Sequence, residues 1–262
     1  MDYKDTVLPI LRESREMLLS QWGTAEVVAQ KDESAVNVVT ELDKKVETFV
    51  SGKLKAVYPE IEFVGEEFGG NRSAGKLWLM DPIDGTGHYI RGLPFCTSMI
   101  ALVENGKVIF SAIYDFINDD MYWAQKGQGA YKNEVGLKVS SRSLKQSYIG
   151  WETHLDKEEN LKIFHELRKR SILIKTVASG WEYAMIASGK LDARVAFDPH
   201  GKDYDFAPGA LLVMEAGGKV VNLYSDQYDY RNTNFIAANE IIFKELTEGP
   251  EALFPIKGFI NK

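Results

Sequence analysis

Two aspartates end an apolar run in the stretch WLMDPIDGTGHYI, which spans residues 78–90. Asp81 and Asp84 follow the run 77–80, whose apolar side chains are typical of a buried strand. Unpaired charge at the end of a core strand is costly, so a cation that offsets the repulsion is one interpretation. A turn is the other, because Asp side chains bind their own backbone and Gly accepts positive φ.

Further acidic side chains stand at the ends of other expected elements. Glu66 and Glu67 follow the expected strand 61–64, and Asp205 stands just ahead of an expected apolar helix that contains Pro208. Each has a simpler interpretation when taken alone. The Gly-Glu-Glu segment is also typical of a solvated loop, and the aspartate before the helix is typical of a cap.

Together these acids predict a metal site. Oxygen ligands without a cysteine or histidine cluster favour a hard cation such as Mg²⁺. A pair of such ions can clamp the oxygens of a phosphoryl group and activate a water molecule. If Gly85 opens a short helix, its backbone N–H groups face an anion, and Thr86 adds a hydroxyl that can orient water.

A family resemblance follows from these motifs. WLMDPIDGT at 78–86, VGEE at 64–67 and the later Asp205 followed by EAGG at 215–218 closely resemble the inositol monophosphatase family. That family consists of Mg²⁺-dependent, lithium-sensitive phosphatases related in fold to fructose-1,6-bisphosphatase. The resemblance covers nearly the whole chain, beginning at NVVTELDKKVE (37–47). The DPIDGT match is highly specific, whereas the later motif is less so.

The resemblance implies a metal-binding role for each matching acid. Glu66, Asp81 and the backbone carbonyl of Ile83 would hold a first Mg²⁺. Asp81, Asp84 and Asp205 would hold a second, within a site of two or three ions.

The resemblance also implies catalytic and phosphate-binding roles. Gly85 and Thr86 would contact the phosphate, and Thr86 would also touch the attacking water. Asp43 would polarise Thr86, or serve as the N3 acid of a capping box with Thr40, and the two roles are compatible. Glu67 would support the site from behind the metal ligands.

Several positions depart from the family pattern. GHY at 87–89 stands where the family usually has x-Asn-Phe, and Tyr204 replaces the usual Trp before Asp205. Pro208 alters the usual Ala-Ala-Gly, and Asn37 stands where Asp is common. The metal carboxylates are all kept, so these changes put the choice of substrate in doubt rather than the chemistry.

Three further residues are candidates for substrate contact. His88 either contacts the substrate or replaces Asn in packing and hydrogen bonding. Asp198 matches an acid that binds substrate hydroxyls in the family, or it is a loop acid before Pro199. Ser179 either offers a hydroxyl or amide to the substrate or caps a helix.

The elements that must position these residues divide into two halves. Residues 1–145 are expected to form two helices and then a mostly antiparallel sheet that carries most of the metal ligands. Residues 146–262 alternate strands with helices, which predicts an α/β half that completes the site. We expect the halves to pack as one unit with the site between them, in a layered αβαβα sandwich whose second sheet is mixed.

Composition excludes several other classes of protein. The chain of 262 residues has a formal net charge of -7, which argues against nucleic acid as a main partner. Its single cysteine, Cys96, excludes an intramolecular disulfide and is expected in the core. No signal-peptide core or membrane-length apolar run is present, so we expect a soluble cytoplasmic protein. The resemblance implies a homodimer.

The sequence therefore predicts a Mg²⁺-dependent phosphomonoesterase of a small sugar or polyol monophosphate, with inositol phosphate as the first choice. Fructose 1,6-bisphosphate, histidinol phosphate and 3′-phosphoadenosine nucleotides are alternative substrates, because relatives in the family divide them. A non-catalytic protein that binds metal and regulates a partner is the alternative from another class.

Overall fold

The computed structural model describes residues 2–30, 38–175 and 177–256. Its helices are α1 (Lys4–Glu13), α2 (Arg15–Ser20), α3 (Glu41–Val57), α4 (Thr86–Tyr89), α5 (Glu158–Arg170), α6 (Ser179–Ala187), α7 (Asp203–Glu215) and α8 (Glu240–Thr247). Its strands up to the middle of the chain are β1 (Val27–Gln30), β2 (Val38–Thr40), β3 (Glu62–Gly65), β4 (Lys76–Asp84), β5 (Thr97–Glu104), β6 (Lys107–Asp115), β7 (Asp120–Gln125), β8 (Ala130–Lys132) and β9 (Val135–Gly136). The later strands are β10 (Tyr148–Glu152), β11 (Ile172–Lys175), β12 (Ala193–Ala196), β13 (Lys219–Asn222) and β14 (Phe235–Ala238).

Two large sheets follow the predicted division between antiparallel and mixed strands. The first runs in the order β3-β4-β5-β6-β7-β8-β9, and only its β3–β4 pair is parallel. The second runs in the order β11-β10-β12-β14-β13. Its β10 pairs in parallel with both neighbours, whereas β14 is antiparallel to β12 and β13.

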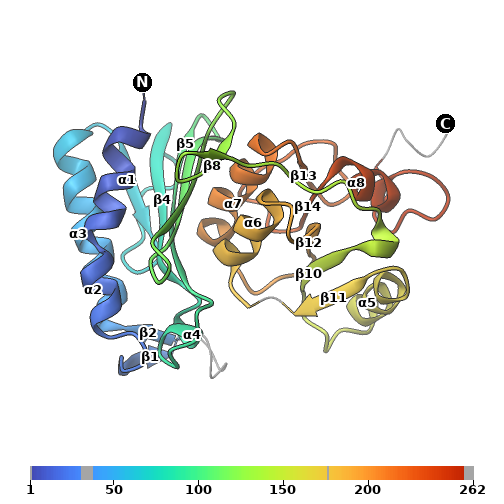
Figure 1. The fold of residues 1–262 in the computed structure, drawn as a ribbon, viewed down its shortest axis with the longest axis horizontal. Coiled ribbons are helices and arrows are strands. Elements are labelled where there is room, and N and C mark those ends of the chain that lie inside the picture. Colours follow the sequence, from blue (N-terminus) through green and yellow to red (C-terminus); the bar gives the residue numbers. More distant parts are fainter. Residues whose placement is uncertain (1, 31–37, 176, 257–262) are drawn as a thin grey trace.

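The helices form three layers around these sheets. In Figure 1, α1, α2 and α3 cover the outer face of the first sheet, α6 and α7 lie between the sheets, and α5 and α8 lie beyond the second. This arrangement is the predicted αβαβα sandwich. No helix among the described residues is long and apolar enough to cross a membrane.

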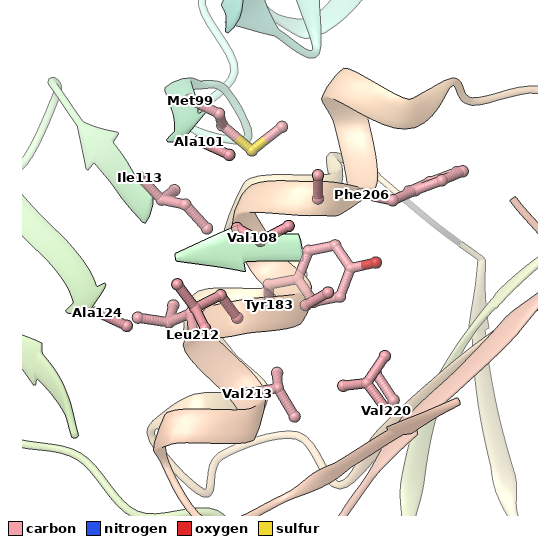
Figure 2. Close-up of a cluster of buried hydrophobic side chains, with 14 of the residues drawn as sticks. Met99, Ala101, Val108, Ile113, Ala124, Tyr183, Phe206, Leu212, Val213 and Val220 are labelled. Carbon is pink, nitrogen blue, oxygen red and sulfur yellow. The ribbon is translucent and has the colours of Figure 1, made fainter. Parts of the chain in front are cut away.

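Strand β5 shows why the first sheet is apolar on both faces. Met99, Ala101 and Val103 belong to the buried cluster shared with α6 and α7. Ile100 and Leu102 alternate with them and join the cluster on the side of α1 to α3. Figure 2 shows the central cluster, where sheet residues meet Tyr183 and other side chains of the middle helices. A sheet covered on both faces reads as a continuous apolar run, as β5 does.

Most predicted elements are present, with three corrections. The single N-terminal helix is two helices, divided at Ser14. The sequence predicts a strand over GLKVS (136–140), but only its first residue lies in a strand, Val135–Gly136. The sequence also predicts a strand over ILIKTVA (172–178), of which Ile172–Lys175 form a strand and 177–178 do not. The short pair β1 and β2 lacked any prediction, since Val27–Gln30 has no alternating pattern.

Helix α3 begins where its capping signals predict. Thr40 is the N-cap, and Asp43 at N3 completes the capping box. Apolar residues spaced mostly three and four positions apart from Leu42 to Val57 predict one apolar helix face, and Leu42, Val46, Val50 and Leu54 are buried. Val57, which the same spacing places on that face, is exposed at the end of the helix.

The close packing of α6 on α7 yields a stability prediction. A Cβ atom added at Gly209 would lie 1.9 Å from Cδ2 of the buried Tyr183. We expect Gly209→Ala to lower the free energy of unfolding by about 1–3 kcal/mol, because the packed core cannot move aside without strain. The same change at Gly52, which lies exposed in α3 with open space around it, should raise stability by about 0.5–1 kcal/mol. Urea unfolding of both variants measures the difference, and two effects of the same sign would contradict it.

Candidate functional site

A bulge in β4 places two predicted metal ligands on one face of the sheet. Asp81 pairs with Met99 of β5, whereas Asp84 pairs with Thr97, so three steps on β4 oppose two on β5. Side chains three positions apart would otherwise point to opposite faces. The extra residue restores the common face, and Pro82 lies inside the bulge, where a strand tolerates proline.

Helix α7 brings the third carboxylate to this face. Among the described residues, Asp81, Asp84 and Asp205 each offer a carboxylate oxygen, and these oxygens lie within 4.8 Å of one another. Asp205 lies in the first turn of α7, not ahead of the helix as the sequence predicts. Its Oδ2 accepts a hydrogen bond of 2.5 Å from the backbone N–H of Lys202, so it also serves the helix terminus.

Glu66 lies outside this triplet but within its electrostatic reach. After burial, its charge is the next cause that raises the pKa of both Asp81 and Asp205. The predicted first-metal ligands Glu66, Asp81 and Ile83 come from the ends of β3 and β4, which are parallel neighbours. Parallel pairing therefore delivers both acidic motifs to the same edge of the sheet.

Burial and repulsion between like charges both make the negative charge of this cluster costly. Burial is the main cause that raises the pKa of Asp81 well above its usual range, and Glu66, Asp205 and Asp84 raise it further. Burial also raises the pKa of Asp205, with additional contributions from Glu66 and Asp84. Asp81 Oδ1 is buried and has no hydrogen-bond partner among the described residues. An orphaned carboxylate oxygen amid crowded carboxylates fits a hard divalent cation such as Mg²⁺.

The N-terminus of α6 holds Asp84. The backbone N–H groups of Ser179 and Gly180 donate to its two oxygens at 3.1 and 2.8 Å, and the Thr97 hydroxyl lies 3.2 Å from Oδ2. Burial raises the pKa of Asp84 to about 6, while these N–H groups, Arg194 and Thr97 lower it. The helix terminus therefore fixes the direction of this carboxylate.

Gly85 and Thr86 open the short helix α4, as the phosphate-binding hypothesis requires. Gly85 is its N-cap at φ 80°, and a Cβ there would lie 2.5 Å from the backbone oxygen of Phe95, so both conformation and space demand glycine. Thr86 Oγ1 lies 2.8 Å from the Ile83 carbonyl oxygen and 3.2 Å from Asp43 Oδ1. Because a hydroxyl has one proton, it can donate to only one of these acceptors at a time.

Asp43 makes both of the contacts considered for it. Its Oδ2 accepts from the backbone N–H of Thr40 at 2.8 Å and from the Thr40 hydroxyl at 2.6 Å, while Oδ1 faces Thr86. Burial raises its pKa to about 6, against the lowering effect of the Thr40 hydrogen bonds. The capping box thus fixes the carboxylate that reaches Thr86.

Glu47 is a supporting residue that the sequence analysis missed. It is buried one helical turn after Asp43, and its carboxylate accepts the backbone N–H groups of Glu67 at 2.8 Å and Phe68 at 3.1 Å. It therefore holds the loop that carries Glu66. The available signal was the spacing of two acids four positions apart beside an apolar face of α3.

The candidates for substrate contact meet different neighbours. Ser179 is the first residue of α6 and not its cap, which is Ala178, so the capping interpretation is wrong. Its hydroxyl accepts from Arg194 Nη2 at 3.1 Å. His88 is half-buried in α4, with its ring edge-to-face with Phe95 at a centroid distance of 6.1 Å.

Asp198 lies in the loop between β12 and α7. Its carboxylate contacts Lys157 Nζ at 2.5 Å and Asn160 Nδ2 at 3.0 Å. Mainly through the Lys157 hydrogen bond, these contacts lower the pKa of Asp198. The carboxylate is thus already engaged, as expected of a loop acid, and a contact with substrate hydroxyls stays a prediction.

The acidic cluster is distinct from a cavity of about 400 Å³ at the other end of the same strands. That cavity lies where β3 and β4 begin, whereas the acids stand where these strands end. It is lined by Lys55, Pro59, Glu60, Ile61, Glu62, Phe63, Ala74, Gly75, Lys76 and Trp78. None of the predicted site residues is among them.

The raised carboxyl pKa values yield a prediction about metal-free protein. Folding favours the protonated form of Asp81, so wild-type stability should fall as the pH rises through the raised pKa. Asp81→Asn removes this penalty and should raise the free energy of unfolding on the order of 1 kcal/mol at neutral pH in EDTA. The advantage should shrink in acid, where wild-type Asp81 is protonated, and thermal unfolding across pH measures it.

Added Mg²⁺ should reverse the order of stability, because wild type alone keeps the complete carboxylate set. Asp226→Asn is the matched control, since Asp226 is exposed and outside the cluster. An Asp81→Asn variant that Mg²⁺ stabilises as much as wild type would contradict the metal assignment.

Two curated relatives match along nearly the whole chain. One is a fructose-1,6-bisphosphatase/inositol-1-monophosphatase of Thermotoga maritima, 27% identical over 249 residues and 95% of each chain. Another is Nus factor SuhB of Pseudomonas aeruginosa, 30% identical over 247 residues and 90% of each chain.

A solved structure and a family model agree with these relatives. The Thermotoga maritima IMPase structure superimposes with a TM-score of 0.83 at 27% identity, covering 94% of this chain and 95% of the other. The model of the inositol monophosphatase family matches residues 5–251. The chain with the β4 carboxylates and the α6 and α7 termini described above therefore belongs to the inositol monophosphatase family.

Proposed function

We propose that this protein is a Mg²⁺-dependent phosphomonoesterase that acts on a small sugar or polyol monophosphate. The observation that carries the proposal is the Thr86–Asp43 contact of 3.2 Å beside the triplet of Asp81, Asp84 and Asp205. A hydroxyl with a buried carboxylate partner stands next to a site built for hard cations. This combination suits hydrolysis of a phosphate ester.

The proposed role of each residue follows from its position in the site. The carboxylates of Glu66, Asp81, Asp84 and Asp205 and the carbonyl of Ile83 would hold two or three Mg²⁺ ions. Mg²⁺ bound there would lower the pKa of water and neutralise charge on the phosphoryl oxygens.

The groups at the start of α4 would act on the phosphate and on water. The backbone N–H groups of Thr86 and Gly87, at the start of α4, would bind phosphate oxygens, whereas those of His88 and Tyr89 donate to the Gly85 carbonyl. Thr86 would orient a water molecule for in-line attack, with Asp43 holding its hydroxyl. The Glu67 backbone and Glu47 would keep the loop of Glu66 in place.

The substrate proposal rests on the relatives' names and on the family. The Thermotoga maritima relative is named for both fructose 1,6-bisphosphate and inositol 1-phosphate, which are phosphate esters of a sugar and a polyol. Histidinol phosphate and 3′-phosphoadenosine nucleotides are the alternative esters. His88, where the chain departs from the family pattern, and Asp198, which matches a family acid, are the proposed substrate contacts.

A panel of phosphate esters tests the substrate class. With Mg²⁺, we expect the highest kcat/KM on inositol 1-phosphate or a similar polyol phosphate, and inhibition by Li⁺. Phosphate release from each ester, with and without Li⁺, is the measurement. Preference for a nucleotide or for histidinol phosphate would contradict the polyol proposal while leaving the phosphatase proposal intact.

A regulatory binding protein is the second candidate, favoured by the 30% identity to Nus factor SuhB. The full set of metal carboxylates favours catalysis over binding alone. Turnover of any ester that requires Mg²⁺ supports the enzyme, whereas absence of turnover across the panel supports the binding protein.

The homodimer and the cytoplasmic location stay predictions. Light scattering at assay concentration tests the homodimer.

Paired substitutions at the site test the proposed roles. We expect Asp84→Asn to abolish Mg²⁺-dependent phosphate release while the protein remains folded. Thr86→Val should lower kcat by about 10²–10⁴-fold, because the oriented hydroxyl is lost. Thr86→Ser keeps the hydroxyl and should retain most activity, and Asp226→Asn is the control for acid removal. Steady-state kinetics with circular dichroism measures these outcomes, and an active Asp84→Asn enzyme would overturn the assignment.

A further inference from the structure

Arg194 is a fully buried cation behind the metal-binding cluster. It lies in β12 with 0% exposure, although arginine is rarely buried without partners. Its guanidinium donates to Glu182 Oε2 at 2.7 Å, to Glu152 Oε2, and to the Ser179 hydroxyl at 3.1 Å. The rings of Tyr183 and Phe206 flank it, each with its centroid 5.3 Å from the guanidinium carbon.

One arm of this network reaches Asp84. Arg194 contacts the hydroxyl of Ser179, and the backbone N–H of the same residue donates to Asp84 Oδ1 at 3.1 Å. The start of α6 is therefore held between the guanidinium and the carboxylate. Movement of Arg194 would move the two N–H groups, from Ser179 and Gly180, that fix the direction of Asp84.

The other arm reaches Asp205. Glu152 accepts the guanidinium through Oε2, and its Oε1 accepts the backbone N–H groups of His200 at 3.1 Å and Gly201 at 2.9 Å. These residues lead directly into α7, whose Asp205 accepts the N–H of the next residue at 2.5 Å. Arg194 thus bridges the supports of two metal carboxylates that lie far apart in the chain.

The network is a poor device for stability alone. A buried ion pair loses much of its Coulomb attraction to the cost of removing both charges from water, and apolar replacements are often as stable. This network also restricts its neighbours, since a Cβ at Gly150 would lie 2.6 Å from Glu182 Oε2. The hydrogen bonds of this network have fixed directions and join the supports of Asp84 and Asp205. Apolar packing could not orient these supports as well, because dispersion contacts have no preferred direction.

We propose that Arg194 is a positioning residue that sets the spacing of Asp84 and Asp205 for metal binding. The guanidinium acts through Ser179 on one side and through Glu152 on the other, and it touches neither metal nor substrate. This inference rests on the proposed metal site. It goes beyond that proposal by assigning the affinity of the site to a residue outside the ligand set.

The test is Mn²⁺ binding to Arg194→Lys, measured by isothermal titration calorimetry on folded protein. Lysine keeps the charge but cannot hold three acceptors in the fixed geometry of a guanidinium. We expect Mn²⁺ to bind about 10–100-fold more weakly, as for other groups that orient metal ligands. The Mg²⁺ concentration for half-maximal activity should rise by a similar factor, while KM for the ester at saturating Mg²⁺ changes little.

Arg142→Lys is the matched control. Arg142 also pairs with a buried carboxylate, Asp192 Oδ1 at 2.7 Å, and also donates to the Gly189 carbonyl. We expect the Arg142→Lys variant to lose thermal stability while its affinity for Mn²⁺ stays unchanged. If Arg194→Lys behaves like this control, with lower stability and wild-type Mn²⁺ affinity, the inference is wrong.

Two milder variants keep the inference testable if Arg194→Lys does not fold. Ser179→Ala cuts the arm to Asp84 and retains the backbone N–H, while Glu152→Gln weakens the arm to Asp205. Both should weaken Mn²⁺ binding, and the double variant should be non-additive because both act through one guanidinium. Additive effects, or no effect, would overturn the inference.

The outcomes separate this inference from the proposed enzyme. Mg²⁺-dependent hydrolysis by wild type, with unchanged Mn²⁺ affinity in the Arg194 variant, overturns the positioning role alone. Weakened Mn²⁺ binding in the variant, with no ester hydrolysed by wild type, overturns the phosphatase alone.

Discussion

The candidate site depends on holding three carboxylates close together, two of them buried and one partly buried. Asp81, Asp84 and Asp205 keep oxygens within 4.8 Å of one another, and both burial and mutual repulsion oppose this. The surrounding structure resists the repulsion with fixed dipoles and hydrogen bonds, including the α6 terminus at Asp84. What these groups leave unbalanced is the charge that a divalent cation supplies.

Local signals made much of this site predictable from sequence. The acids adjoin expected element ends, and the Thr40–Asp43 capping box depends only on residues of the same helix turn. The αβαβα layers follow from strand and helix patterns together with the family resemblance. The β4 bulge escaped prediction, because register depends on pairing with β5 and the letters DPID read equally well as a turn.

Long-range polar contacts escaped for a related reason. Glu47 binds a backbone group 20 positions away in the chain, and Arg194 contacts Glu152, 42 positions away, so nothing near them in sequence indicates these partners. The only sequence signal for these two residues was a charged side chain within an apolar strand or on an apolar helix face. For Arg194 the strand β12 reads ARVA, where a charged side chain amid small apolar residues needs a buried counter-charge.

The cation site of this chain is easier to predict from sequence than its choice of substrate. A cation site needs ligands of a particular chemical type that meet at one point. A few acids at the ends of elements are therefore enough to predict it. Substrate hydroxyls can be met by many side chains from loops, and the candidate Asp198 is already bound to Lys157 and Asn160. His88 packs on Phe95 beside Gly85, where a substrate bound by its phosphate would begin to differ from another. The cation site can therefore be predicted from the acids at the end of β4, whereas the proposed substrate contacts involve side chains that also have other structural roles.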